Sequence, residues 1–250
     1  MPMGYVFTIA DARAYQRWTE DPRNQSAIAS QNRLMLEMLG ARRGETLLDV
    51  GCGTGLRFNP FLEAGVNVSG VDPSDGMLDA ARRIFADRAD LHRGFAEDLP
   101  FDDNSFNYAV MVLSLEFVDD SAKAIEEACR VAKDRIFIGV LNRYALKNLG
   151  QRLEGIFSHS VFNRARFFSV WELKRMLRER LGDVPLTWRT TCRLPDGAGG
   201  IARCIQNAGI AQKLPFGTFV GITATLVPRF RTRPLCMRYQ TKRTTGIVPG

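Results

Sequence analysis

Short apolar segments alternate with amphipathic ones over residues 46–141 of this chain. Residues 74–85 and 121–132 repeat apolar positions at helical spacing, and the first of these segments begins at a serine suited to capping a helix. The segment 108–113 is nearly all apolar, as a strand covered on both faces should be. Strands are predicted at 46–50, 66–71, 90–95, 108–113 and 135–141. The alternation favours an α/β fold with a parallel, doubly wound sheet and right-handed crossovers.

Helices are predicted on both flanks of this region. Tyr15 and Trp18 belong to a short aromatic helix that breaks at Pro22, and a second helix runs from about residue 26 to residue 39. Ser169 and Glu172 have capping-box spacing, which predicts a helix to about residue 181. Later expectations are strands at 185–193 and 218–227, a glycine-rich loop at 196–209, and irregular chain from Pro228 onward.

A glycine-rich turn follows the first predicted strand. Gly51, Gly53 and Gly55 come without a spacer, and glycine tolerates positive φ and lets a ligand approach the backbone closely. Asp72 ends the second strand, where a carboxylate can accept hydrogen bonds from the two hydroxyls of a ribose. The glycine turn and this strand-end acid together predict a nucleoside-containing cofactor.

The spacing of the glycines distinguishes between cofactors. The dinucleotide fingerprint is G-x-G-x-x-G, but this chain has Leu56 where the third glycine of that pattern would stand. Asp49, two positions before the first glycine, would repel a pyrophosphate and attract an ammonium group. The expected ligand therefore carries a ribose and a cationic amino group, which fits S-adenosylmethionine better than a dinucleotide.

Several segments resemble a known family. Residues 47–55 and 71–78 look like the first two motifs of class I S-adenosylmethionine-dependent methyltransferases. Residues 96–106 resemble the third motif of the small-molecule branch (methyltransferase type 11) that includes the ubiquinone/menaquinone C-methyltransferases, and 110–118 are similar to the fourth. The resemblance covers roughly residues 41–141, and more loosely residues 15–227. It implies a Rossmann-like, doubly wound seven-stranded sheet with the last strand antiparallel.

The resemblance also implies an organisation of the chain and a set of cofactor contacts. The expected parts are an N-terminal helical cap over the cofactor site at 1–40, an S-adenosylmethionine-binding core at 41–141, the C-terminal half of the sheet with a substrate-side insertion at 142–230, and a basic tail at 231–250. The expected cofactor-binding residues are Asp49, Gly51, Cys52, Gly53, Asp72, Pro73, Met77, Phe95, Ala96, Glu97, Leu113, Ser114, Tyr15 and Trp18. Phe95 departs from the family, which usually has an aspartate there, so adenine recognition would rest on the Ala96 backbone, on Glu97 or Asp98, or on stacking by Phe95.

Two expected contacts have an alternative. Tyr15 and Trp18 either line the methyl-transfer chamber or anchor the N-terminal segment to the core. Met77 either packs on the adenine or fills the core.

The expected activity is transfer of a methyl group to a small, hydrophobic or aromatic acceptor by in-line displacement, in which positioning is the protein's main task. No single catalytic residue is identified; the candidates are Glu116, Tyr15 and Tyr144. Residues 114–117 lack the [DNS]-P-P-[YFW] element of amino methyltransferases, which disfavours that chemistry. The alternative function is a non-catalytic protein that binds S-adenosylmethionine or S-adenosylhomocysteine as a partner or regulatory subunit.

Composition sets the remaining bounds. The 250 residues contain 45% hydrophobic and 24% charged residues, values ordinary for a globular protein. The five cysteines are scattered and there are only two histidines, which favours free thiols, no metal site and a cytoplasmic location. The net charge is +7, and the chain after Asp196 has basic but no acidic residues. That basic end either contacts an anionic surface or is solvated; its charges lack interleaved aromatic pairs, which argues against a nucleic-acid partner.

Overall fold

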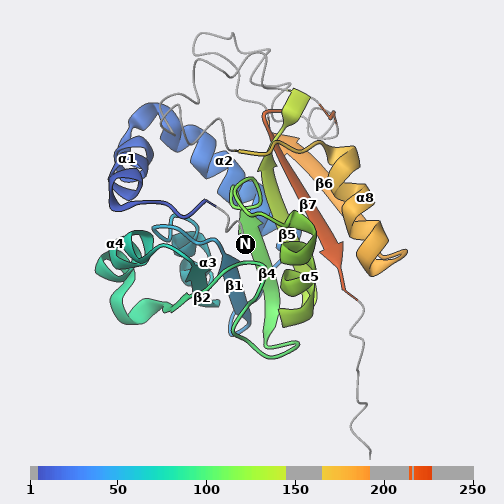
Figure 1. The fold of residues 1–250 in the computed structure, drawn as a ribbon, viewed down its shortest axis with the longest axis horizontal. Helices are drawn as coiled ribbons and strands as arrows, with labels where there is room; N and C mark the ends of the chain where they lie inside the picture. The colour runs from blue at the N-terminus through green and yellow to red at the C-terminus, as the bar shows by residue number, and fades with distance from the viewer. Residues whose placement is uncertain (1–4, 145–164, 192–213, 216, 227–250) are drawn as a thin grey trace, which may run out of the picture.

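The computed structural model describes residues 5–144, 165–191, 214–215 and 217–226. Within them, seven strands form one sheet in the order β3-β2-β1-β4-β5-β7-β6 (Figure 1). The strands are β1 (Thr46–Val50), β2 (Asn67–Asp72), β3 (Asp90–Arg93), β4 (Phe106–Val112), β5 (Ala132–Leu141), β6 (Leu186–Thr191) and β7 (Phe219–Thr225). β7 is antiparallel to both of its neighbours, and the pairs among β1 to β5 are parallel. The predicted seven-stranded sheet with an antiparallel last strand is confirmed.

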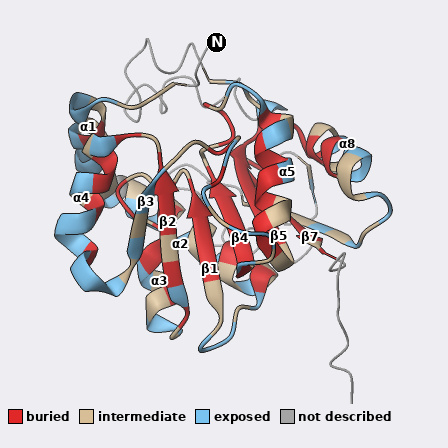
Figure 2. Ribbon diagram, turned by 60° about the horizontal axis from the view of Figure 1, so that its bottom comes forward, coloured by how far each residue is buried: buried red, intermediate tan, exposed pale blue. Residues whose placement is uncertain are grey.

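Helices cover both faces of the sheet. They are α1 (Ile9–Glu20), α2 (Pro22–Leu39), α3 (Phe58–Glu63), α4 (Asp75–Phe85), α5 (Ser121–Val131) and α8 (Val170–Leu181), with a short 3-10 turn, η1 (Ala86–Arg88). In Figure 2 the central strands are buried, and the exposed residues of α4 lie on its outer side. None of the helices in the described part of the chain combines the length and the hydropathy that crossing a membrane requires.

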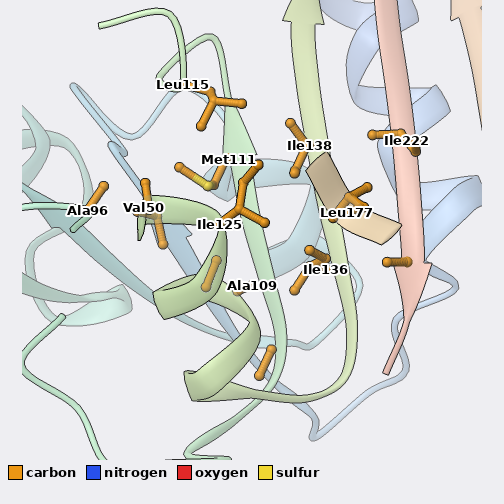
Figure 3. Packing of buried hydrophobic residues seen from close by; sticks show 14 of the residues in the cluster. Val50, Ala96, Ala109, Met111, Leu115, Ile125, Ile136, Ile138, Leu177 and Ile222 are labelled. Atoms are coloured by element: carbon orange, nitrogen blue, oxygen red, sulfur yellow. The ribbon is translucent and has the colours of Figure 1, made fainter. Parts of the chain in front are cut away.

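Alternation along the strands sends side chains into two separate cores. Leu48 and Val50 of β1 belong to the core under α5 and α8, whereas Leu47 belongs to the core under α2, α3 and α4. Figure 3 shows the first core, where Ile125 of α5 and Leu177 of α8 pack over β4, β5 and β7. Because each central strand buries side chains on both faces, its sequence is nearly all apolar.

Aromatic side chains fill the second core where glycines leave room. Gly139 of β5 pairs with Gly221 of β7, and a Cβ on either glycine would contact the ring of Phe137 or Phe219. Phe58 and Phe61 of α3 are completely buried in the same core. The face under α2 and α3 is thus packed by rings lying over bare backbone.

Several predicted boundaries were wrong. α2 begins at Pro22 and not near residue 26, because a proline fits the first position of a helix, where its missing N–H is not needed. β5 begins at Ala132 and not at residue 135, and β3 ends at Arg93 and not at residue 95. The predicted loop at 196–209 and the tail at 231–250 lie outside the described residues.

Replacing Phe137 with alanine tests the second core. The completely buried ring packs over two glycines that leave little backbone able to close a cavity, so Phe137→Ala is expected to lower the free energy of unfolding by about 3–5 kcal/mol. Urea unfolding followed by circular dichroism measures the change. The matched control is Ile84→Ala, at a side chain that is half exposed on α4, with a change expected within about 0.5 kcal/mol. A loss below about 1 kcal/mol for Phe137→Ala would contradict this account of the core.

Candidate functional site

One cleft lies at the carboxyl ends of β1, β2, β3 and β4. Open parallel sheets bind ligands at this edge, where neighbouring strands diverge. All the expected cofactor residues except Trp18 line it: Tyr15, Asp49, Gly51, Cys52, Gly53, Asp72, Pro73, Met77, Phe95, Ala96, Glu97, Leu113 and Ser114. The cleft is also lined by residues that the sequence argument did not assign to the cofactor, among them Arg57, Leu56, Val112 and Phe117.

The glycine turn after β1 wraps over the end of β2. The N–H groups of Gly51 and Cys52 both donate to the carbonyl oxygen of Val71, at 2.8 and 3.1 Å. Gly51 has a φ of +74°, and a Cβ on it would overlap the Cβ of Ser114 at the end of β4. Only glycine satisfies both the backbone conformation and this close approach.

The Asp72 carboxylate joins this turn to the start of α4. One of its oxygens accepts a hydrogen bond from the Gly53 N–H at 2.9 Å, and the other accepts from the Ser74 N–H at 2.9 Å. Asp72 is buried, which raises the pKa of its carboxyl group, although these two hydrogen bonds act in the opposite direction. Because a carboxylate oxygen can accept two hydrogen bonds, each oxygen keeps one acceptor position for a ligand hydroxyl.

Asp49 contributes a buried oxygen without a partner. The side chain is 2% exposed, and among the described residues its Oδ2 receives no hydrogen bond. Burial raises the pKa of Asp49 to about 7; the Arg57 guanidinium acts to lower it and Asp72 acts to raise it further. A buried acceptor in this state is costly unless a ligand donor meets it.

Arg57 is the charged cleft residue that sequence reasoning missed. It stands at the N-cap position of α3, is 5% exposed, and donates from Nη1 to Asn32 Oδ1 at 2.6 Å and from Nη2 to Gln31 Oε1 at 2.7 Å. Burial lowers the pKa of Arg57, while Tyr15 and Asp49 act to raise it. The available signal was an arginine within a few residues of the glycine turn, at the start of a helix that was not given bounds.

The end of β4 has a strained backbone. Leu113 has a φ of +57°, a region that leucine rarely occupies, and its N–H donates to the Gly139 carbonyl oxygen at 2.8 Å. The hydroxyl of Ser114, next in the chain, is buried and has no hydrogen-bond partner among the described residues. Glu97, another residue that lines the cleft, accepts from the N–H groups of Asp119 and Asp120 at 2.9 and 3.3 Å.

The N-terminal segment crosses the cleft before α1. The Tyr5 N–H donates to the Phe117 carbonyl oxygen at 3.0 Å, and the Phe7 carbonyl oxygen accepts from Ser74 Oγ at 2.6 Å. The Phe7 ring meets the rings of Tyr5 and Phe117 edge to face, with centroids 5.0 Å apart in both pairs. These contacts place an aromatic wall beside the glycine turn.

The two aromatic residues of α1 differ in whether they line the cleft. Tyr15 lines the cleft and Trp18 does not, and both pack against the cluster around Phe117 and Leu141. The two rings stack with centroids 6.0 Å apart and an interplanar angle of 18°. Tyr15 therefore belongs to the cleft wall, and the Trp18 ring stacks on it. Met77 lines the cleft and is 4% exposed; its packing on the adenine stays a prediction.

The three catalytic candidates lie in different places. Tyr15 lines the cleft, and burial raises the pKa of its hydroxyl. Tyr144 is 56% exposed and meets the ring of Trp171 edge to face. Glu116 is buried just outside the cleft lining, where one carboxylate oxygen accepts from the Leu141 N–H at 2.9 Å and ties the end of β4 to the end of β5.

Part of the chain is similar in sequence to known methyltransferases. Residues 48–137 match the model of a family described as methyltransferase domain. The demethylmenaquinone methyltransferase of Renibacterium salmoninarum is 36% identical over 115 residues, which is 46% of this chain and 48% of that protein. That of Paenarthrobacter aurescens is 38% identical over 101 residues, 40% of each chain. The matched part thus spans less than half the length of these curated relatives.

Two solved structures share the fold over most of the chain. An S-adenosylmethionine-dependent methyltransferase from Thermotoga maritima, titled a possible histamine N-methyltransferase, has a TM-score of 0.59 at 24% identity, over 86% of this chain and 99% of that one. Magnesium protoporphyrin IX methyltransferase from Synechocystis, crystallised with S-adenosylmethionine, has a TM-score of 0.53 at 13% identity, over 81% and 79% of the two chains. At these identities the likeness establishes the fold.

The protonation state of Glu116 should change the free energy of unfolding with pH. Burial raises the pKa of Glu116 to about 7, so between about pH 4.3 and pH 7 the folded chain retains a proton that the unfolded chain has released. Stability contributed by this group therefore falls as the pH rises through that window. Glu116→Gln mimics the protonated form. Its free energy of unfolding relative to that of the parent is therefore expected to be about 2 kcal/mol higher at pH 8 than at pH 5, measured by urea unfolding at both pH values.

The control for Glu116→Gln is Glu126→Gln, which removes an exposed carboxylate of α5. The Glu126 side chain is 61% exposed, so the substitution should change stability by less than about 0.5 kcal/mol at either pH. An equal effect of the Glu116 substitution at pH 5 and pH 8 would contradict the assignment of a titrating buried carboxyl group.

Proposed function

We propose that the chain is a class I, S-adenosylmethionine-dependent methyltransferase, supported by the match of residues 48–137 to the methyltransferase-domain family, and that it transfers a methyl group from S-adenosylmethionine to a small aromatic acceptor. The observation that carries the proposal is the pairing of Asp49 and Asp72 in one cleft. One carboxylate has an unpartnered buried oxygen, and the other retains acceptor positions beside a glycine turn. A ligand with a cationic amine at one end and a ribose at the other satisfies both.

The residues present fit this cofactor. Asp72 would accept hydrogen bonds from the ribose hydroxyls, and Asp49 would hold the ammonium group directly or through water. The bare backbone at Gly51 and Gly53 allows close approach of the methionine part. The remaining expected contacts would divide between the adenine (Pro73, Met77, Phe95, Ala96 and Glu97) and the methionine part (Cys52, Leu113, Ser114 and Tyr15).

The bound cofactor would supply a methyl group already activated by its sulfonium sulfur. The chain's own task is then to orient the acceptor for in-line attack and to exclude water. The aromatic wall formed by Tyr5, Phe7 and Phe117 suits both purposes, because it gives a flat apolar acceptor a surface on which to stack.

The acceptor class we propose is a hydroxylated aromatic ring of the quinol kind. The apolar wall supports this class, and so do the relatives named demethylmenaquinone methyltransferases. An ionised quinol is itself a good nucleophile and needs little help from a base. Tyr15 is the catalytic candidate that reaches the cleft, and we propose that its hydroxyl hydrogen-bonds the acceptor oxygen. Neither Glu116 nor Tyr144 is among the cleft's lining residues.

Methyl transfer is tested directly with the purified full chain. Titration calorimetry with S-adenosylhomocysteine establishes binding, and a labelled methyl donor is then incubated with a short-chain demethylmenaquinol and with simple phenols. The expected result is micromolar binding and label transferred to the quinol. Binding with no transfer to any acceptor would favour the non-catalytic, cofactor-binding alternative, and no binding would overturn the proposal.

The role of Asp72 is tested by Asp72→Asn. The substitution keeps one carbonyl oxygen but replaces the second acceptor with a donor, so the ribose diol loses a charge-assisted partner. S-adenosylhomocysteine is expected to bind about 10- to 100-fold more weakly in calorimetry. The matched control is Asp75→Asn, the same chemical change at a 64% exposed side chain three residues away. Equal affinities of Asp72→Asn and the parent would contradict the ribose assignment.

A further inference from the structure

Arg57 is a buried cation without an anionic partner in the described part of the chain. Its guanidinium lines the cleft, and both of its hydrogen bonds go to the neutral amides of Gln31 and Asn32. No carboxylate of the described residues lies within ion-pair distance of it, whereas Arg130, Arg143 and Arg166 each have at least one. A desolvated charge is costly unless it is paired, and two neutral amides compensate for only part of that cost.

The guanidinium also has unused donors. An arginine carries five N–H groups, and Asn32 and Gln31 take one from each terminal nitrogen. Within the described residues, the other three donors meet no acceptor. Two helix-borne amides thus hold the planar group in place on one side and leave the rest of it available to a planar anion.

Asp49 indicates which kind of anionic ligand would fit beside Arg57 in the cleft. Asp49 and Arg57 both line the cleft and are both buried, and each acts on the pKa of the other, yet no ion pair joins them. The cleft therefore presents a buried negative group and a buried positive group close together, each without a charged partner. This arrangement is complementary to an α-amino acid, whose ammonium and carboxylate are attached to the same carbon.

We propose that Arg57 binds the α-carboxylate of the cofactor's amino-acid end, with Gln31 and Asn32 of α2 as its positioning residues. This inference rests on the proposed function and extends it, because it makes the site selective for nucleosides that retain the carboxylate. A decarboxylated cofactor keeps the ribose, the adenine and the amine but leaves Arg57 unpaired. The N-terminal helix α2, through its two amides, then takes part in cofactor recognition without contacting the cofactor.

Three ligands separate this role from a structural one. Calorimetry is carried out on the full chain with S-adenosylhomocysteine, with its decarboxylated analogue, and with 5′-methylthioadenosine, which lacks the whole amino-acid end. The parent is expected to prefer S-adenosylhomocysteine to the decarboxylated analogue by about 10- to 100-fold, the range for a hydrogen-bonded charge. Arg57→Gln should abolish that preference and leave the affinity for 5′-methylthioadenosine within about twofold of the parent.

Two further variants are controls for the role of Arg57. Arg57→Lys keeps the charge but loses the planar fork, and it should retain part of the preference for the carboxylate. Arg82→Gln removes an arginine from the exposed surface of α4, at a side chain that is 50% exposed, and should leave all three affinities unchanged. Binding of 5′-methylthioadenosine reports in each variant that the nucleoside part of the cleft is folded.

The outcomes distinguish this inference from the function on which it rests. If the parent binds none of the three nucleosides, the proposed function fails and this inference with it. If the parent binds them but Arg57→Gln keeps the full preference for the carboxylate, the inference alone is overturned. It is also overturned if Arg57→Gln weakens all three ligands equally, because Arg57 would then only support the fold of the cleft.

Discussion

The Asp72 carboxylate is the contact on which the geometry of the cleft depends. It receives the Gly53 N–H from the turn after β1 and the Ser74 N–H from the turn into α4, both at 2.9 Å. Hydrogen bonds from backbone N–H groups to a buried carboxylate are among the stronger ones in proteins. They fix two turns, nineteen or more residues apart in sequence, against each other. The Ser74 hydroxyl then donates to the Phe7 carbonyl oxygen, so the N-terminal segment is attached to the same corner.

Arg130 and Glu127 form a hydrogen-bonded network outside the cleft. Arg130 donates to Glu127, to Asp103 and to the carbonyl oxygens of Leu99 and Phe101, and Glu127 in turn accepts from the Leu99 N–H. In the cleft, by contrast, Asp49 Oδ2 and Ser114 Oγ are buried without partners among the described residues. Buried oxygens without a hydrogen-bond partner also occur outside the cleft, at Glu116 Oε2, Ser121 Oγ and Thr223 Oγ1, but those of Asp49 and Ser114 lie beside the glycine turn, where a ligand would complete them.

The sequence predicted the sheet and most of the cleft because both follow from local rules. Gly51, Gly53 and Asp72 stand at strand ends, and strand ends were visible as the limits of apolar runs. The position of Trp18 was not predictable in this way, since a stacked aromatic pair on one helix turn can face either the cleft or the core. Arg57 was missed because its burial depends on Gln31 and Asn32, residues of another helix that no local pattern links to it.

The strained backbone at the end of β4 also helps to hold the geometry of the cleft. A leucine at positive φ costs on the order of 1 kcal/mol, and Leu113 is held there because its N–H continues the pairing with Gly139 on β5. The next residue, Ser114, packs against Gly51 so closely that a Cβ on the glycine would overlap it. Relaxing Leu113 to an ordinary strand conformation would redirect the chain at this contact and move it away from the glycine turn. The strained residue and the bare turn are therefore two parts of one close contact, which fixes the ends of β1 and β4 against each other.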